Sequence, residues 1–322
     1  MSKCFQSALL VSGLAAGLLL PCAALLQAQE QNQEQEQPRG VIRVGVNLVL
    51  VDATIKTKSG QILADLKKEN FELREDGAEQ KIDLFSRDEL PLNVALVLDL
   101  SDSIGPFLGP LRNAANTALS ALKADDEVAL FTFSTEAELR VPFTKDKASI
   151  ANEFNSFHAG GATNINDGIF LPAQSFLKLP QTGRRVIILI SDDVGTDAGG
   201  QGTRDIVTEL IASDAVLYNL KIPGYNPPQT LFAASMVPGL VNIRKVMEQT
   251  GGEVFDVQDV SHLDAVFRAL IQRIKTRYTL GYYTHATAAL GKPHKLDLRL
   301  SPSFGKKGKD YVVLSKTAYY IH

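Results

Sequence analysis

Three oxygen-bearing side chains stand at alternate positions directly after an apolar run of the sequence. The run covers residues 94–98 and leads into Asp99, Ser101 and Ser103. Alternate side chains of an extended loop can share one side of the backbone, which would bring one carboxylate and two hydroxyls together. These oxygens are hard donors that suit Mg²⁺ or Mn²⁺ and, less closely, Ca²⁺. The spacing therefore predicts a divalent-cation site, although the same residue types also serve as helix caps.

Two later stretches add donors of the same kind. Gly160 and Gly161 precede Thr163 just ahead of a predicted helix, and another apolar run is followed by Asp192. Taken alone, Thr163 would be interpreted as a helix cap and Asp192 as a loop aspartate. If the fold brings the three loops together, they supply one set of five donors: Asp99, Ser101, Ser103, Thr163 and Asp192.

Between residues 91 and 276 the sequence alternates strand and helix signals. Nearly continuous apolar runs, which suit strands buried on both faces of a parallel sheet, lie at 94–100, 127–134, 184–191, 215–222 and 252–257. Helical patterns lie at 107–123, 167–177, 204–213, 241–249 and 261–275. The alternation predicts an α/β fold with a doubly wound, mostly parallel sheet. Ligands of such sheets bind beyond the carboxyl ends of the strands, where the five candidate donors would stand.

The flanking segments, residues 41–90 and 277–322, carry β signals instead. Residues 49–56 alternate apolar and polar side chains, and residues 71–85 predict a hairpin. Two or three strands bury little apolar surface alone. We therefore expect the two segments to pair into one smaller β domain, with the α/β domain of residues 91–276 inserted between them. Residues 221–239, rich in Pro and Gly, predict a surface excursion.

The first 28 residues have the features of a secretory signal peptide: a positive start, an apolar run at 8–20 and a small residue, Ala28, at the end. We expect cleavage near Ala28, export to the periplasm or the extracellular space, and no transmembrane helix in the mature chain. A lipid anchor on Cys22 is the less favoured alternative, because Pro21 stands where a small residue is expected.

Composition narrows the class of protein further. Both cysteines, Cys4 and Cys22, lie in the predicted signal peptide, so the mature chain would have no disulfide and no cysteine-ligated zinc site. Residues 29–40 are polar and of low complexity, which predicts a disordered linker. The net charge of -3 gives no basic footprint for nucleic acid.

The five positions, in this order and at strand ends, resemble the metal-ion-dependent adhesion site of von Willebrand factor type A domains. That pattern is D-x-S-x-S, then a Thr on a second loop, then an Asp after a third strand. The resemblance covers about residues 93–275. The flanks "NFELREDGAEQKIDLFS" and "YTLGYY" resemble exported proteins of acidobacteria that carry this domain within β segments.

The resemblance implies a role for each position. Ser101 and Ser103 would coordinate the ion directly, and Thr163 directly or through water. Asp99 and Asp192 would hold it mainly through water or hydrogen bonds. Neutral hydroxyls leave the cation electrophilic, so that an acidic side chain of a protein partner can complete its coordination. The chain would then be an exported, non-enzymatic binding or adhesion module with Mg²⁺, or Mn²⁺ or Ca²⁺, as its ion.

Two carboxylates depart from or add to this pattern. The family usually has Gly after the last Asp, whereas this chain has Asp193, and Asp102 lies inside the triplet. Extra carboxylates would tighten cation binding or repel an acidic partner. They also keep open a metal-dependent hydrolase, in which either would act as general base to a metal-positioned water. A structural component of envelope assembly is the third alternative.

Overall fold

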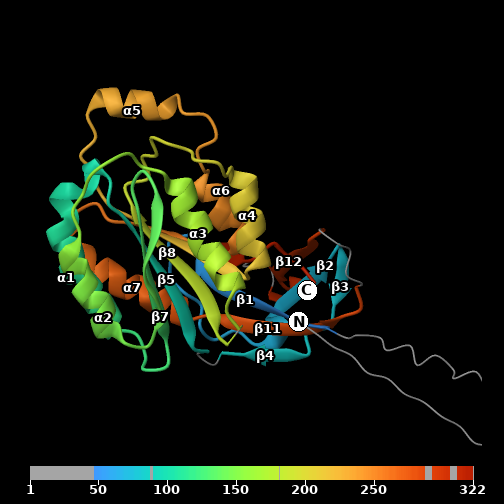
Figure 1. The fold of residues 1–322 in the computed structure, drawn as a ribbon. Coiled ribbons are helices and arrows are strands. Elements are labelled where there is room, and N and C mark those ends of the chain that lie inside the picture. The colour runs from blue at the N-terminus through green and yellow to red at the C-terminus, as the bar shows by residue number, and fades with distance from the viewer. Residues whose placement is uncertain (1–46, 88–89, 181, 287–291, 305–309, 322) are drawn as a thin grey trace, which may run out of the picture. The chain divides into compact units, whose positions relative to one another are not determined.

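A six-stranded sheet forms the centre of the α/β region in the computed structural model (Figure 1). Its strand order is β10-β9-β8-β5-β6-β7, and all neighbours are parallel except β6 and β7. The strands are β5 (Leu92–Asp99), β6 (Glu127–Phe133), β7 (Ala137–Thr144), β8 (Arg184–Ser191), β9 (Ala215–Lys221) and β10 (Val254–Asp256). This arrangement confirms the predicted doubly wound, mostly parallel α/β fold class.

The structure describes residues 47–87, 90–180, 182–286, 292–304 and 310–321. The predicted signal peptide, with Cys4 and Cys22, and the predicted linker of residues 29–40 lie outside the described residues. No helix within the described ranges is long and apolar enough to cross a bilayer.

Helices cover both faces of the central sheet, and the central strand β5 is buried along its whole length. One face carries α1 (Leu108–Ser120), α2 (Lys147–Glu153) and α7 (Leu263–Lys275), and the other carries α3 (Ile165–Leu177), α4 (Thr203–Ala212) and α6 (Ile243–Thr250). Val94 and Leu96 point into the first layer, whereas Ala95 and Val97 point into the second. Alternate side chains of the strand thus pack into two different cores, so every position is apolar and the run in the sequence is unbroken.

Two antiparallel sheets make up the remainder of the described chain. One has the order β13-β1-β11-β4 and the other β14-β12-β2-β3. Their strands are β1 (Asn47–Thr57), β2 (Phe71–Glu75), β3 (Ala78–Gln80), β4 (Leu84–Ser86), β11 (Tyr278–Thr284), β12 (His294–Leu300), β13 (Tyr311–Ser315) and β14 (Ala318–Tyr319). Strand β1 pairs with β11 and β13, so segments before and after the α/β region share a sheet and a third core.

Several predicted elements differ from the structure. The predicted hairpin of residues 71–85 is wrong in its second half: β2 pairs with the short β3, and β4 joins the other antiparallel sheet. The predicted excursion of residues 221–239 contains helix α5 (Pro228–Ser235), and α2 and β7 were not predicted. Short 3₁₀ turns complete the chain: η1 (Lys68–Asn70), η2 (Asp102–Phe107), η3 (Phe154–Ser156), η4 (Val260–His262) and η5 (Pro302–Phe304).

Candidate metal site

The five predicted donors all lie on loops at the carboxyl edge of the central sheet. Asp99 is the last residue of β5, and Ser101 and Ser103 follow it at the start of η2. Thr163 precedes α3, and Asp192 follows the last residue of β8. Asp99 is fully buried, and Ser103, the most exposed of the five, has only 9% of its surface accessible.

The first loop brings its three donors into one cluster. The Ser101 amide donates to Asp99 Oδ1 at 2.8 Å, which folds the loop back over the end of β5. The Oγ atoms of Ser101 and Ser103 lie 3.2 Å apart, so the alternate spacing of the sequence places both hydroxyls on one side. The second Asp99 oxygen, Oδ2, accepts a 2.7 Å hydrogen bond from Ser191 Oγ at the end of the neighbouring strand β8.

The loop of Thr163 is hydrogen-bonded to both of the other loops. The Gly160 amide donates to the Leu100 carbonyl at 2.7 Å, which ties it to the loop of Ser101. The Thr163 amide donates to Thr196 Oγ1 at 2.8 Å, and the Thr163 carbonyl accepts from the Thr196 amide at 3.0 Å. Because Thr196 lies just after Asp192, these contacts fix the second and third loops against each other.

Asp192 contacts a segment that follows strand β9. Its Oδ1 accepts from the Val194 amide at 3.0 Å, and its Oδ2 accepts from Asn226 Nδ2 at 2.7 Å. A Cβ at Gly224 would lie 1.8 Å from Asp192 Oδ2, so only glycine permits this approach. The Tyr225 amide donates to the Ser103 carbonyl at 3.0 Å. The same short segment therefore touches a residue from each of two donor loops.

The charge of Asp99 is costly at this position. Burial raises the pKa of Asp99 to about 6, while hydrogen bonds from Ser101 and Ser191 act in the opposite direction. A cation beside it would favour the ionised form through opposite charge. A positively charged ion close to Asp99 would therefore stabilise its buried carboxylate.

Asp193, the departure from the usual glycine, has a backbone φ of 64°. Aspartate is one of the few non-glycine residues that adopt this left-handed conformation without a large penalty. Its carboxylate turns to Asn219, whose Nδ2 lies 2.8 and 3.0 Å from the two oxygens, and Lys221 Nζ is 4.0 Å away. Burial raises the pKa of Asp193 to about 6, with the Asn219 hydrogen bonds opposing it.

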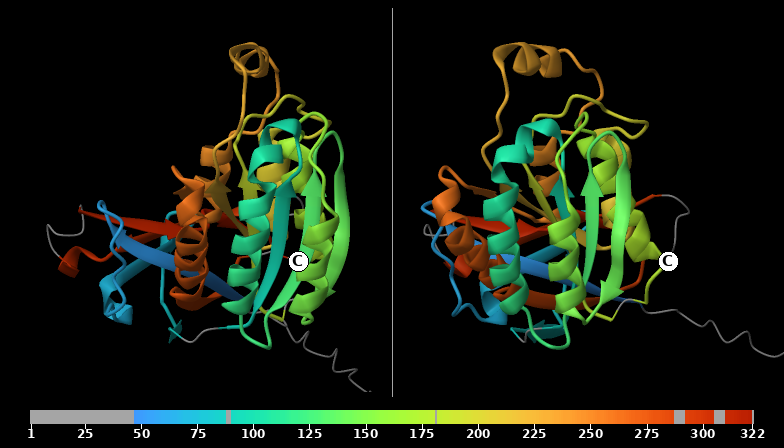
Figure 2. Two further views of the ribbon diagram at one scale, coloured as in Figure 1. Left: turned by 90° about the vertical axis from the view of Figure 1, so that its left-hand side faces the viewer. Right: turned by 60° about the vertical axis from the view of Figure 1, so that its left-hand side comes forward.

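Residues 222–242, which connect β9 to α6, we name the arm. The arm contains no charged residue and carries helix α5, which stands away from the α/β body above the edge where the strands end (Figure 2). Tyr225, Phe232 and Met236 expose 73%, 69% and 70% of their surface. The arm therefore presents uncharged apolar surface at the same end of the sheet as the candidate metal site.

The far end of the arm is held by Asn166, which is fully buried at the start of α3. Its Nδ2 donates to the Gly239 carbonyl at 2.9 Å, and its Oδ1 accepts from the Val241 amide at 2.9 Å. Neither Asn166 nor Asn226 was predicted as a functional residue. No spacing pattern could have identified them, because both act on segments distant in the sequence.

The chemistry of the donor set fits a hard divalent cation. No group of three or more His, Cys, Asp or Glu side chains that could hold a metal occurs in the described part of the chain. The cluster instead offers hydroxyls beside two carboxylates, and both oxygens of each carboxylate already accept hydrogen bonds. Such a set fits Mg²⁺ or Mn²⁺ held by neutral hydroxyls, with the carboxylates acting through hydrogen bonds or water.

Comparisons with known proteins agree with this geometry. Residues 94–195 match the family described as von Willebrand factor type A domain. No curated protein sequence matches the chain significantly.

Solved structures similar to the chain include three of different origin. A von Willebrand factor type A protein from Catenulispora acidiphila is 12% identical, with 77% of this chain and 72% of that chain covered and a TM-score of 0.46. An aerotolerance-related membrane protein from Bacteroides fragilis is 20% identical, with 57% and 98% covered and a TM-score of 0.43. Proximal thread matrix protein 1 from the mussel byssus, with a zinc-occupied MIDAS motif, is 15% identical, with 62% and 49% covered and a TM-score of 0.46.

These TM-scores are low, so the family assignment rests on the matched residues and on the layout of the central sheet. The match begins in β5, includes Asp99, Ser101, Ser103, Thr163 and Asp192, and ends after β8. The chain is a protein with a von Willebrand factor type A domain.

Proposed function

We propose that the chain is an exported binding module that engages a protein partner through a divalent cation, Mg²⁺ in the first place, at its metal-ion-dependent adhesion site. The observation that carries the proposal is the buried pair of hydroxyls of Ser101 and Ser103, 3.2 Å apart, beside Asp99. Ser101, Ser103 and Thr163 would ligate the ion, and Asp99 and Asp192 would hold it through hydrogen bonds or water. The ion would add electrophilic character at this edge of the sheet.

The partner group that suits this site is a carboxylate. Hydroxyl ligands are neutral, so they leave most of the charge of a divalent cation uncompensated. An acidic side chain of a partner would both neutralise the ion and take up a coordination position. The interaction would therefore require the metal and would be lost on chelation.

The arm offers the apolar contact area that such an interaction needs. A single ion–carboxylate contact does not make a specific interface, which also requires a desolvated apolar core. Tyr225 is exposed beside the site, Phe232 and Met236 are exposed on α5, and the arm has no charge that would resist desolvation. We infer that the partner packs apolar side chains on the arm while its carboxylate approaches the ion.

The proposal includes the domain organisation that the sequence predicts. It consists of a signal peptide of residues 1–28, a linker of residues 29–40, and an α/β domain of residues 91–276 between β segments. Export to the periplasm or outside the cell follows from the signal peptide, as in the exported acidobacterial proteins that the flanks resemble. The antiparallel pairing of β1 with β11 supports this insertion of one domain in another.

The hydrolase alternative has less support. It requires a general base close to the ion, and Asp193 was one of two candidates. Both of its oxygens accept hydrogen bonds from Asn219, which directs the carboxylate toward β9. Envelope assembly, the third alternative, would use the same cation chemistry with a permanent partner.

The proposal is tested by a metal-dependent pull-down from the cell envelope of the source organism. Native protein is compared with Ser101→Ala/Ser103→Ala and with a control, Ser149→Ala/Ser156→Ala, whose serines lie in α2 and η3. We expect a partner that native and control proteins retain in Mg²⁺, and that EDTA or the site substitutions release. Retention that is equal with and without metal would contradict the proposal.

A second variant tests the contribution of the arm to partner binding independently of the ion. Phe232→Ser/Met236→Ser removes exposed apolar area without touching a candidate ligand. We expect partner retention to fall at least about tenfold, as for loss of an interface anchor, while Mg²⁺ affinity stays unchanged. Unchanged retention would limit the partner contact to the ion and its surroundings.

A further inference from the structure

A cavity of about 750 Å³ lies at the opposite edge of the central sheet from the metal site. It is lined by the start of β8, by β1 and β11 of an antiparallel sheet, and by the segment between β13 and β14. None of the five candidate metal donors lines it. Cavities of this size accommodate small organic ligands.

The charges that line the cavity do not balance. They comprise four cations and two carboxylates: Arg184, Arg185, Arg277, Lys316, Asp52 and Asp214. Two ion pairs account for four of them, because Arg184 Nε lies 3.0 Å from Asp52 Oδ2 and Lys316 Nζ lies 2.6 Å from Asp214 Oδ1. The lining therefore holds two more cations than carboxylates, and Asp214 attracts Arg185 as well as Lys316.

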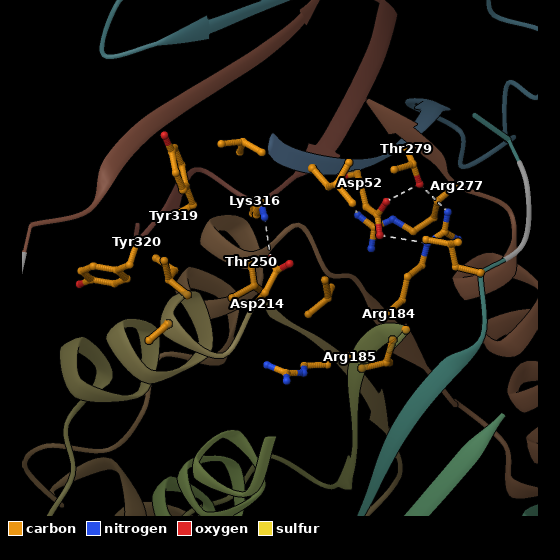
Figure 3. A pocket seen from close by; sticks show the side chains of 18 of the residues that line it. Asp52, Arg184, Arg185, Asp214, Thr250, Arg277, Thr279, Lys316, Tyr319 and Tyr320 are labelled. Atoms are coloured by element: carbon orange, nitrogen blue, oxygen red, sulfur yellow. Dashed lines mark hydrogen bonds and ion pairs between the residues drawn. The ribbon is translucent and has the colours of Figure 1, made fainter. Parts of the chain in front are cut away.

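Figure 3 looks into this cavity and shows where the charged and aromatic side chains lie. In that view Asp52, Arg184, Arg277 and Thr279 lie together at one end, Tyr319 and Tyr320 at the other, Lys316 and Asp214 between them, and Arg185 below.

Arg185 and Arg277 are buried, with 7% and 5% of their surface exposed. Arg185 donates to the carbonyls of Ser213 and Leu179, at 2.8 and 2.7 Å. Arg277 donates to the Tyr218 hydroxyl at 2.9 Å and to backbone carbonyls. No carboxylate of the described residues forms an ion pair with either, and the Nε of each lacks a hydrogen-bond partner among those residues.

An excess of buried cations over carboxylates is expensive, and proteins normally pair such charges. Burial lowers the pKa of the Arg185 guanidinium, because removal from water disfavours its charged form. Guanidinium groups bind carboxylate and phosphate oxygens through short, charge-assisted hydrogen bonds. An anion in the cavity would neutralise the excess positive charge.

We propose that this cavity binds a small organic dianion, whose carboxylate or phosphate groups face Arg185 and the end that holds Arg277. Tyr320 also lines the space, and its hydroxyl can donate a further hydrogen bond. The proposal is independent of the metal site, because the two lie at opposite edges of the sheet.

The test is a calorimetric titration of the full chain with succinate and, separately, with inorganic phosphate, at constant ionic strength in chloride. We expect saturable binding at one site. Preference for succinate would identify an elongated dicarboxylate as the ligand class, and preference for phosphate a compact phosphate group. Saturating ligand should also raise the thermal midpoint by several degrees.

Variants tie the binding to the cavity. Asp214 has a φ of 51°, which asparagine also adopts readily, so Asp214→Asn preserves the backbone. Removing this carboxylate should tighten anion binding by about tenfold, and Arg185→Gln should weaken it by about tenfold. Arg268→Gln, on the exposed side of α7, removes one positive charge as Arg185→Gln does, and it should leave the affinity for the anion unchanged.

Two results would overturn the proposal. One is a folded wild-type protein that binds neither dianion saturably. The other is binding that Asp214→Asn and Arg185→Gln leave at the affinity of the Arg268→Gln control, which would locate the anion elsewhere on the surface. Asp214→Asn is expected to bind the anion more tightly, so the proposal can be tested even if Arg185→Gln does not fold.

Discussion

Asp193 combines a backbone requirement and a charge in one residue. The turn after β8 has a left-handed conformation at Asp193, which glycine and aspartate both adopt without a large penalty. The aspartate adds a carboxylate near the candidate metal site, and Asn219 holds that carboxylate in position. The negative charge would act on a bound cation through space rather than as a ligand.

Asp193→Asn tests that interpretation. Asparagine keeps the left-handed turn, so we expect the free energy of unfolding to change by no more than about 1 kcal/mol. Loss of the nearby charge should weaken Mg²⁺ binding about three- to tenfold, measured by calorimetric titration. Asp125→Asn, an exposed site with 83% of its side chain accessible, is the control. Equal Mg²⁺ affinities for the two variants would contradict the electrostatic role.

The D-x-S-x-S spacing alone placed Ser101 and Ser103 on one side of their loop, because short-range backbone geometry sets that relation. The hydrogen bonds that Asp192 and Asp193 accept were not predictable in the same way. Their donors, Asn226 and Asn219, come from later segments and are selected by the tertiary fold. A single sequence carries no signal for such pairs.

The arm is an element held at its two ends and exposed in its middle. Asn226 anchors its start to Asp192, and Asn166 anchors its end. Within α5 only Ala234 is buried, so little apolar packing adds to these anchors. Local stability of the arm should therefore depend on a few hydrogen bonds.

Asn226→Ala should loosen the arm without unfolding the protein. Loss of a hydrogen bond to a charged group costs about 1.5–3 kcal/mol, so local opening should increase about tenfold or more. Limited proteolysis within residues 222–242 measures this directly. Asn113→Ala, at an exposed position of α1, is the control. Cleavage at the same rate in both variants would show that Asn226 does not anchor the arm.

The turn between β2 and β3 carries a pH-dependent contact. Asp76 Oδ1 accepts from the Lys295 amide at 2.9 Å, and Oδ2 lies 2.8 Å from His294 Nδ1. The Lys295 hydrogen bond, followed by His294, lowers the pKa of Asp76 below its ordinary 3.8. A lowered pKa stabilises the fold above the unfolded value, and that contribution is lost as the pH falls through the folded value.

Asp76→Asn should therefore destabilise the protein at neutral pH and lose its effect in acid. Asn tolerates the φ of 49° at this position, so the difference reports the charge. Urea unfolding of both proteins between pH 7 and about 3 gives the comparison. Asp125→Asn, at a carboxylate with 83% of its side chain accessible, controls for net charge. A stability gap that does not narrow toward acid would be inconsistent with a lowered pKa.

The elements that the sequence did not predict share one property: they bury little apolar surface. Strand β7 is an edge strand that contains Pro142, and α5 begins with Pro228 and shows no amphipathic stripe. Ile82 is buried in the β core although it lies outside any strand, so its apolar character wrongly extended the predicted hairpin. In contrast, β5 and β8 were predictable because both of their faces are buried.

Across the whole molecule, one buried cluster joins the central sheet to the antiparallel sheet. Arg184, at the start of β8, pairs with Asp52 of β1 at 3.0 Å and donates to Thr279 Oγ1 of β11 at 2.8 Å. Thr279 Oγ1 in turn donates to Asp52 Oδ1 at 2.6 Å. The two layers are thus connected by charged contacts in addition to covalent links.

Asp52→Asn should weaken this connection. It breaks the ion pair between Asp52 and the buried Arg184, which costs about 3 kcal/mol of unfolding free energy. Removing the exposed Asp125 partner of Lys145, by Asp125→Asn, should cost less than about 1 kcal/mol. Urea denaturation measures both. Similar small losses in the two variants would indicate that the Arg184 cluster contributes little to holding the layers together.

Calorimetric titration of Mg²⁺ into chelator-treated protein measures whether the loops of Asp99, Thr163 and Asp192 hold a cation. We predict saturable binding at one site in native protein and in Ser149→Ala/Ser156→Ala, and loss of that binding in folded Ser101→Ala/Ser103→Ala. Native protein that binds no divalent cation, or a site variant that binds Mg²⁺ as tightly as native protein, would contradict a metal site at these loops.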